Sequence, residues 1–224
     1  MKIVVLADES LKTELLAQGV NENVHVEWVN KPEDLLKFSD TDIFIDLLFQ
    51  NTPERIKLLQ QLSQATFQKN SVGSSGKSTP VLVNAVNTTL SQLPAGIVRM
   101  NGWNSFLKRP VIEASGDHES IKEKVVQALS FFNKTVEWVP DLPGFVSARV
   151  VAMIINEAYF TLQGEVSTKE EIDTAMKLGT NYPYGPFEWG TKIGLKNVYE
   201  LLATLAKNNK RYEPAALLKK EVLQ

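Results

Sequence analysis

Residues 2–7 read KIVVLA, a short run of apolar and β-branched side chains that ends in the polar turn Asp8-Glu9-Ser10. Such a run is typical of a strand that is buried on both faces of a parallel sheet. The next segment, residues 10–18, places leucines on one helical face and ends at Gly19, a residue that favours a helix C-cap. A strand followed directly by an amphipathic helix predicts an α/β unit.

The same alternation of strand and helix patterns continues to Val139. Strand patterns cover residues 24–29, 42–49, 81–86, 97–103, 110–114 and 135–139, and helical patterns cover 32–38, 53–67 and 118–133. This order predicts a mostly parallel, doubly wound, Rossmann-like sheet with right-handed crossovers. Residues 70–79 are rich in Gly and Ser, and we expect a surface loop there. Its segment 73–78 resembles a phosphate-binding loop, but Ser71 replaces the first glycine and a strand follows instead of a helix.

The pattern changes after Pro143-Gly144, where strand patterns stop. Residues 145–164 are apolar nearly all round in the middle, which predicts a buried helix. Ser167 and Glu170 have the spacing of a capping box, so we expect a helix over residues 169–178 that ends at Gly179. Further helices are predicted over residues 195–208 and 214–223. We therefore expect two domains, a shortened Rossmann-like domain over residues 1–141 and an all-α domain over residues 142–224.

Composition excludes several classes of function. The 224 residues include no cysteine, which excludes disulfides, thiolate metal sites and a cysteine nucleophile. The formal charge of −2 gives no electrostatic signal for nucleic-acid binding. His25 and His118 lack metal-ligand spacing. No apolar stretch reaches the roughly 18 residues of a membrane span, and the N-terminus does not resemble a signal peptide. We expect a soluble, cytoplasmic protein without a nucleic-acid or membrane partner.

The first strand–helix turn argues against a conventional dinucleotide site. A doubly wound sheet binds its ligand beyond the carboxyl ends of the strands, and a dinucleotide needs glycines at this turn. Here the turn carries Asp8 and Glu9, and the first glycine of the chain is Gly19. The two carboxylates would complement the helix dipole themselves and repel a pyrophosphate. The turn is therefore predicted to be a capped helix start, and no cofactor-binding residue is assigned.

Several motifs occur in an order that identifies a family resemblance. Residues 143–149 read PGFVSAR, residues 171–179 read EIDTAMKLG, and residues 182–188 read YPYGPFE. Together they resemble the C-terminal domain of the 3-hydroxyacyl-CoA dehydrogenases, over residues 143–220. Residues 87–90 and 101–113 are similar, more weakly, to segments of the family's first domain. The resemblance implies a Rossmann-like NAD-binding domain and a helical domain that usually forms a homodimer. It also implies NAD-dependent oxidation of the 3-hydroxyl of an acyl-CoA.

Carried over by position, the family's reactive residues change. The catalytic histidine falls at Asn104, whose amide cannot act as a base near neutral pH. The glutamate that orients it falls at Glu113, a substrate-side hydroxyl at Thr88, and a substrate-side asparagine at Ala148. Two interpretations follow. The chain is either an NAD-dependent dehydrogenase of fatty-acid metabolism that uses other residues, or a pseudo-enzyme. The pseudo-enzyme would be a dimeric scaffold, or would bind acyl-CoA or a protein.

Overall fold

The computed structural model describes residues 1–69 and 79–224, which form two compact units, Met1–Leu142 and Pro143–Gln224. The phosphate-loop-like segment 73–78, and all of the predicted surface loop except Thr79, lie outside the described residues. Within the described part of the chain, no helix is long and apolar enough to cross a membrane.

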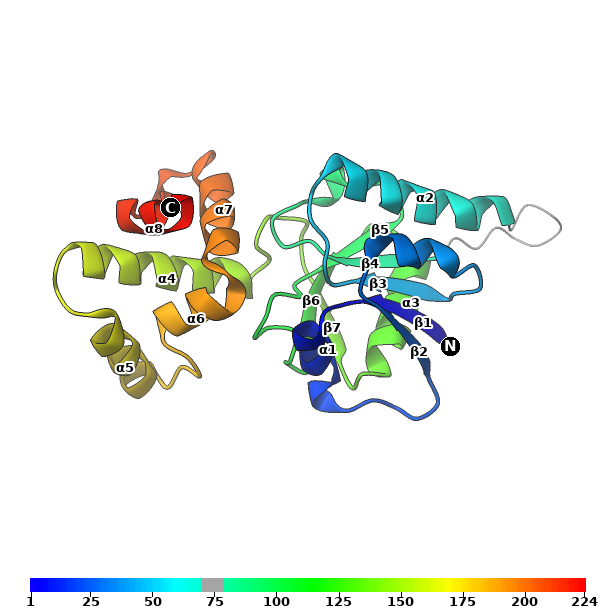
Figure 1. Ribbon diagram of the computed structural model, residues 1–224, viewed down its shortest axis with the longest axis horizontal. Coiled ribbons are helices and arrows are strands. Elements are labelled where there is room, and N and C mark those ends of the chain that lie inside the picture. Colours follow the sequence, from blue (N-terminus) through cyan, green and yellow to red (C-terminus); the bar gives the residue numbers. More distant parts are fainter. Residues whose placement is uncertain (70–78) are drawn as a thin grey trace. The chain divides into compact units, whose positions relative to one another are not determined.

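The first unit is built on one seven-stranded sheet (Figure 1). Its strands lie in the order β2-β1-β3-β4-β5-β6-β7, and their bounds are β1 (Lys2–Leu6), β2 (His25–Val29), β3 (Ile43–Asp46), β4 (Val81–Asn84), β5 (Ile97–Met100), β6 (Val111–Ser115) and β7 (Thr135–Trp138). All neighbouring pairs are parallel except β5 and β6. This confirms the predicted mostly parallel sheet. The strand order reverses between β1 and β3, so the carboxyl ends of these two strands form the topological switch point.

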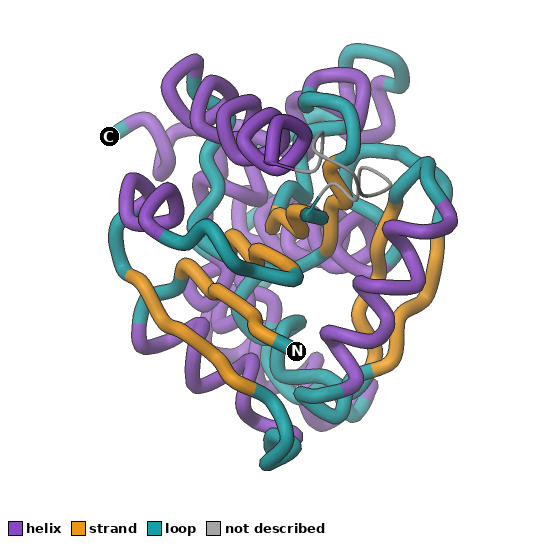
Figure 2. The backbone as a smooth tube through the Cα atoms, turned by 90° about the vertical axis from the view of Figure 1, so that its right-hand side faces the viewer, coloured by secondary structure: helices purple, strands orange, loops and turns teal. Residues whose placement is uncertain are grey.

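Helices cover both faces of this sheet (Figure 2). The helical segments of the unit are α1 (Glu9–Leu15) with the 3-10 helix η1 (Leu16–Gln18), η2 (Pro32–Lys37), α2 (Pro53–Lys69), η3 (Leu90–Gln92) and α3 (Glu119–Ser130). Ile3 and Val5 of β1 pack in one core with leucines of α1 and the buried face of α3. Val4 and Leu6 pack in the opposite core with η2 and α2. The apolar run that opens the chain is therefore buried on both faces, as predicted.

The start and end of the first helical segment follow the sequence prediction. The backbone N–H of Leu11 donates to Asp8 Oδ1 at 2.8 Å, so Asp8 is the N-cap of α1. Gly19 closes the segment with a φ of +84°, a conformation that glycine adopts without strain. The predicted helix over residues 32–38 forms as the 3-10 helix η2.

The second unit is all-helical, which confirms the predicted change of class. Its helices are α4 (Ser147–Gln163), α5 (Lys169–Thr180), α6 (Pro186–Ile193), α7 (Leu195–Ala206), the 3-10 helix η4 (Lys210–Tyr212) and α8 (Ala216–Leu223). The sequence analysis predicts no helix over α6. The buried Asn156 of α4 binds the chain before α8, donating to the Glu213 carbonyl and accepting from the Ala215 N–H, each at 2.9 Å.

Helix α5 begins at Lys169, as predicted, but its capping box and its end differ from the prediction. The capping box is Thr168 with Glu171, one residue later than predicted: each side chain accepts a hydrogen bond from the other residue's N–H. Ser167 instead donates its hydroxyl to Glu171 Oε2 at 2.6 Å. Gly179 lies inside the helix, which ends at Asn181 in the left-handed conformation with φ of +55°. Asparagine tolerates this conformation, so it terminates the helix where glycine was expected to do so.

Candidate active site

The three candidate residues lie in the first unit, close in sequence to strand ends. Thr88 is buried in the loop after β4, and Asn104 lies in the turn after β5. Glu113 lies within β6, which runs antiparallel to β5. The carboxyl ends of β4 and β5 and the beginning of β6 therefore lie at one edge of the sheet, where this fold binds ligands.

The turn that carries Asn104 is held by α1 and its 3-10 extension. Asn104 Nδ2 donates to Ser10 Oγ at 3.0 Å. The N–H of Ser105 donates to both carboxylate oxygens of Glu14, each at 2.8 Å, and Gln18 Nε2 donates to the Lys108 carbonyl at 2.9 Å. Ser10, Glu14 and Gln18 are spaced by four residues and so follow one helical face. Ser105 has a φ of +73°, a strained value for serine, and the hydrogen bond to Glu14 stabilises it there.

A buried lysine directly before β7 supports the same turn. Lys134 Nζ donates to the carbonyls of Leu107 and Arg109, at 2.7 and 3.0 Å. Burial lowers the pKa of Lys134 to about 8, although the charge of Glu14 acts to raise it. The Asn104 turn is thus packed between α1 and the segment before β7, and the carbonyls of Leu107, Lys108 and Arg109 each accept a side-chain hydrogen bond.

Glu113 is hydrogen-bonded to Asn101, and not to Asn104, where the resemblance places the family's histidine. Asn101 Nδ2 donates to Glu113 Oε2 at 3.2 Å, and the Asn101 N–H donates to the Glu113 carbonyl at 2.9 Å. The implied pairing of a base with its orienting carboxylate is replaced by two separate pairings, Glu113 with Asn101 and Asn104 with Ser10. Thr88 stays a prediction as a substrate-side hydroxyl.

The first strand–helix turn does not fit a dinucleotide pyrophosphate. A pyrophosphate needs free N–H groups at the helix start. Here the Asp8 carboxylate accepts the N–H of Leu11, and Glu9 adds a second carboxylate in the first turn. The carboxylates of this turn thus occupy the place where the fold would otherwise bind the pyrophosphate of the cofactor.

Sequence reasoning missed Asn84, which ties three strand ends together. Its Nδ2 donates to the carbonyls of Leu47 and Gly102, both at 3.1 Å, and its Oδ1 accepts the Gly102 N–H at 2.9 Å. A Cβ atom on residue 102 would lie 2.9 Å from Asn84 Cγ, so the close approach requires glycine. The available signal was a polar amide at the end of an otherwise apolar strand.

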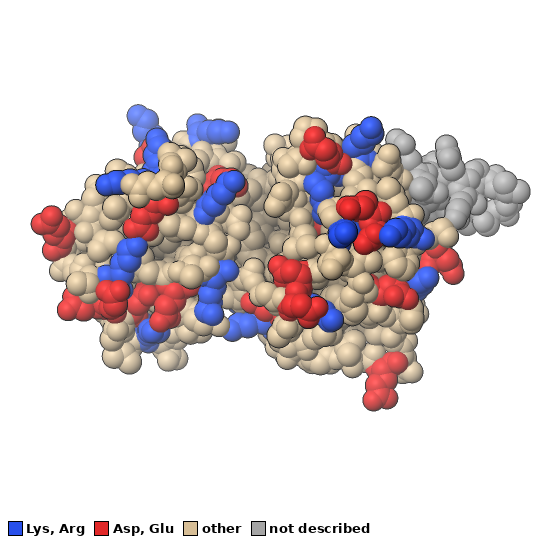
Figure 3. Space-filling view, viewed as in Figure 1, with Lys and Arg blue, Asp and Glu red and all other residues tan. Residues whose placement is uncertain are grey.

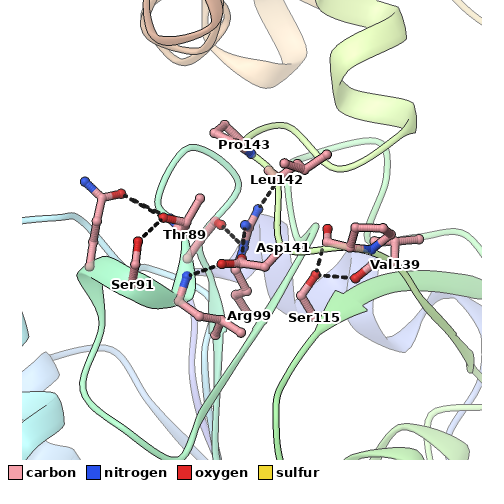
Figure 4. A network of polar contacts seen from close by, with 12 residues as sticks. Thr89, Ser91, Arg99, Ser115, Val139, Asp141, Leu142 and Pro143 are labelled. Carbon is pink, nitrogen blue, oxygen red and sulfur yellow. Dashed lines mark hydrogen bonds and ion pairs between the residues drawn. The ribbon is translucent and has the colours of Figure 1, made fainter. Parts of the chain in front are cut away.

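It also missed Arg99, whose side chain is fully buried. Its Nε donates to the Ala85 carbonyl at 3.0 Å, and its Nη2 donates to the carbonyls of Val86 and Leu142, both at 3.1 Å (Figure 4). Its Nη1 pairs with Asp141 Oδ1 at 2.6 Å, and the other oxygen of Asp141 accepts the Leu90 N–H at 2.9 Å. This network fixes both ends of the loop that carries Thr88. A single arginine within the apolar run 97–100 was the signal.

Another ion pair, buried on both sides, lies at the switch point. Asp46 ends β3, is fully buried, and pairs with Arg55 in the first turn of α2. Its Oδ1 also accepts the Leu48 N–H at 3.1 Å. Burial raises the pKa of Asp46 to about 6, and Arg55 limits the rise. In the described ranges, no group of three His, Cys, Asp or Glu side chains is placed to hold a metal ion.

These observations define an α/β unit, followed in the chain by an all-α unit. In the α/β unit, asparagine side chains hold the ligand-binding edge of the sheet together through hydrogen bonds. Residues 144–224 match the family model described as "3-hydroxyacyl-CoA dehydrogenase, C-terminal domain". The helical unit therefore matches the C-terminal domain of the 3-hydroxyacyl-CoA dehydrogenase family, and the whole chain resembles that family in sequence order and fold. This confirms the resemblance that the motifs indicated.

Individual relatives show how far the similarity extends. The chain is 41% identical over 115 residues to a 3-hydroxyadipyl-CoA dehydrogenase of Escherichia coli, covering 50% of this chain and 24% of that protein. It is 28% identical over 218 residues to a probable 3-hydroxybutyryl-CoA dehydrogenase of Bacillus subtilis, covering 96% of this chain and 74% of the relative. The fold matches the crystal structure of an (S)-3-hydroxybutyryl-CoA dehydrogenase from Ralstonia eutropha with a TM-score of 0.73. That match has 18% identity and covers 99% and 93% of the two chains.

Proposed function

We propose that this chain is a pseudo-enzyme of the 3-hydroxyacyl-CoA dehydrogenase family, a dimeric protein that binds acyl-CoA or a protein partner without the family's standard turnover. One observation carries the proposal: Asn104, where the resemblance places the family's catalytic histidine, donates its amide to Ser10 of α1. An amide has no accessible lone pair on nitrogen to take a proton. Loss of a general base alone typically costs about 10²–10⁴ in rate.

Two further observations support the loss of hydride chemistry. Glu113 is bonded to Asn101, so the carboxylate that would orient a base is engaged with a non-basic amide. The first strand–helix turn carries the carboxylates of Asp8 and Glu9, which disfavour the cofactor's pyrophosphate. The alternative is an NAD-dependent dehydrogenase acting on a 3-hydroxyacyl-CoA, which the names of the relatives favour.

Turnover and ligand binding separate the two functions. We expect the purified chain to give no NADH above background when it is mixed with NAD and 3-hydroxybutyryl-CoA, and no NADH binding at millimolar concentration. We expect calorimetry to detect binding of the acyl-CoA alone. The Bacillus subtilis relative serves as the matched enzyme for the assay. We expect Asn104→His to remain inactive, because Glu113 stays hydrogen-bonded to Asn101 and the first strand–helix turn still carries the carboxylates of Asp8 and Glu9. Clear turnover that Glu113→Ala abolishes would contradict the proposal.

The proposed homodimer is supported by exposed apolar side chains in the helical unit. Phe160, Val166 and Leu223 are large apolar residues on its surface, and Val166 is 74% exposed. Such residues favour a covering surface in an oligomer. We expect light scattering after size-exclusion chromatography to give twice the chain mass of 25.0 kDa. A monomer over the whole concentration range would rule out the homodimer.

A further inference from the structure

An open apolar groove lies between α4 and α5 of the helical unit. Its volume is about 390 Å³, and its walls are formed mainly by Ile154 and Ala158 of α4 and Ile172, Ala175 and Met176 of α5. The alanines on the two facing helices leave room for side chains of another molecule, and a methionine adapts its shape to a bound surface. None of the candidate active-site residues lines this groove.

The charged residues that line the groove are both acidic, Glu157 on α4 and Glu171 on α5. The hydroxyl of Ser167 and the N–H of Thr168 donate to Glu171, at 2.6 and 3.2 Å, which fixes this carboxylate in place. These hydrogen bonds also lower the pKa of Glu171. Lys169, two residues earlier, is engaged with Glu221 at 2.7 Å. On the face drawn in Figure 3, carboxylates gather near α5.

Apolar surface continues beyond the groove along both helices. Val150, one turn before Ile154, is 53% exposed, and Leu178, two turns after Glu171, is 83% exposed. From Val150 to Thr161 the apolar stripe on α4 extends about 16 Å at 1.5 Å per residue. This length accommodates three turns of a helix whose anchors are spaced by three or four residues.

We propose that this groove binds an amphipathic helix of another protein whose apolar residues are flanked by Lys or Arg. The apolar anchors enter between Ala158 and Ala175, and the basic residues pair with Glu157 and Glu171. A second copy docked about a two-fold axis through the groove would place the acidic rim against itself. The carboxylates of Glu157 and Glu171 would likewise repel the phosphates of an acyl-CoA. This proposal rests on the proposed function, because it specifies the kind of protein that the non-catalytic scaffold binds. Binding in the groove does not depend on dehydrogenase turnover, so the two proposals can fail separately.

A pair of labelled model peptides tests the proposal. Each is an amphipathic helix of about 18 residues with leucines at helical spacing; one carries lysines and the other glutamates at the flanking positions. Fluorescence anisotropy with the full chain is expected to show the lysine peptide binding at least about tenfold more tightly. Raising the salt concentration is expected to weaken it. Equal affinity for the two peptides overturns the proposal.

Two variants locate the binding on the groove. Ala175→Trp fills the groove and is expected to abolish binding, whereas the matched control Asn208→Trp, on an exposed position after α7, is expected to bind like the wild type. Glu157→Lys is expected to shift the preference toward the glutamate peptide by about tenfold, and it tests the rim even if Ala175→Trp fails to fold. Wild-type affinity in Ala175→Trp overturns the proposal. So does a dimer that Ala175→Trp converts to a monomer while the wild type binds neither peptide, since a second copy then covers the groove.

Discussion

Replacing Asp141 with alanine is expected to destabilise the first unit by about 2–3 kcal/mol, because it leaves the fully buried Arg99 guanidinium without its carboxylate partner, while the 30% exposure of the Asp141 side chain lets water replace part of the contact. Arg99 is fully buried on β5, and Asp141 is the carboxylate that pairs with it, at 2.6 Å. The same variant leaves the Leu90 N–H without its acceptor. Urea unfolding measures the loss, and hydrogen exchange should localise it to η3 and the amides around Thr88.

A matched control separates this effect from loss of charge. Asp117→Ala removes an exposed carboxylate of the same unit and is expected to change stability by no more than about 0.5 kcal/mol. Combining Asp141→Ala with Arg99→Met should cost less than the sum of the two single changes, because no buried charge is then left unpaired. Equal destabilisation by Asp141→Ala and Asp117→Ala would show that the network in Figure 4 contributes little.

The fold was predictable because its signals are local. Apolar runs such as residues 2–7 alternate with amphipathic helices, and a buried parallel strand needs no partner sequence to be recognised. The Asp8 cap was predictable for the same reason, since the capping side chain and its N–H donor are three residues apart. Helix α6 was missed because Gly185-Pro186 reads as a turn, although proline is well suited to a first helical turn.

The candidate site was less predictable because its contacts join distant segments. Asn104 meets Ser10 across 94 residues, and Arg99 meets Asp141 across 42. No periodicity within one segment reports such a pair. The resemblance located Asn104 and Glu113 as the positions of a base and its orienting carboxylate, but not the partners that the structure gives them, Ser10 and Asn101. Asn84 and Arg99 were visible only as polar residues in apolar runs, which marks a buried polar group without naming what it binds.

The second large effect is expected at Gly185, where alanine should destabilise the helical unit by about 2–5 kcal/mol, from overpacking and loss of a helix cap. A Cβ on residue 185 would lie 2.3 Å from Cγ and Oδ1 of Asp173. Asp173 is buried, and its carboxylate accepts the N–H groups of Phe187 and Glu188 at 2.8 and 3.1 Å, which caps α6. The backbone of Gly185 has an ordinary φ of −71°, so the requirement is for space.

Gly179 supplies the matched control for this prediction. It lies inside α5, and a Cβ there would meet nothing within 4 Å in the described structure. Gly179→Ala is therefore expected to be neutral or to stabilise the unit by up to about 1 kcal/mol through helix propensity. Thermal unfolding followed by the fluorescence of Trp189, in variants that replace the three tryptophans of the first unit, reports on the helical unit alone. If the Asp173 cap is the cause, Asp173→Ala combined with Gly185→Ala should cost less than the sum of the single losses. Additive losses of stability in the double variant, or similar effects of alanine at Gly179 and Gly185, would show that the contact between residue 185 and Asp173 is not the cause.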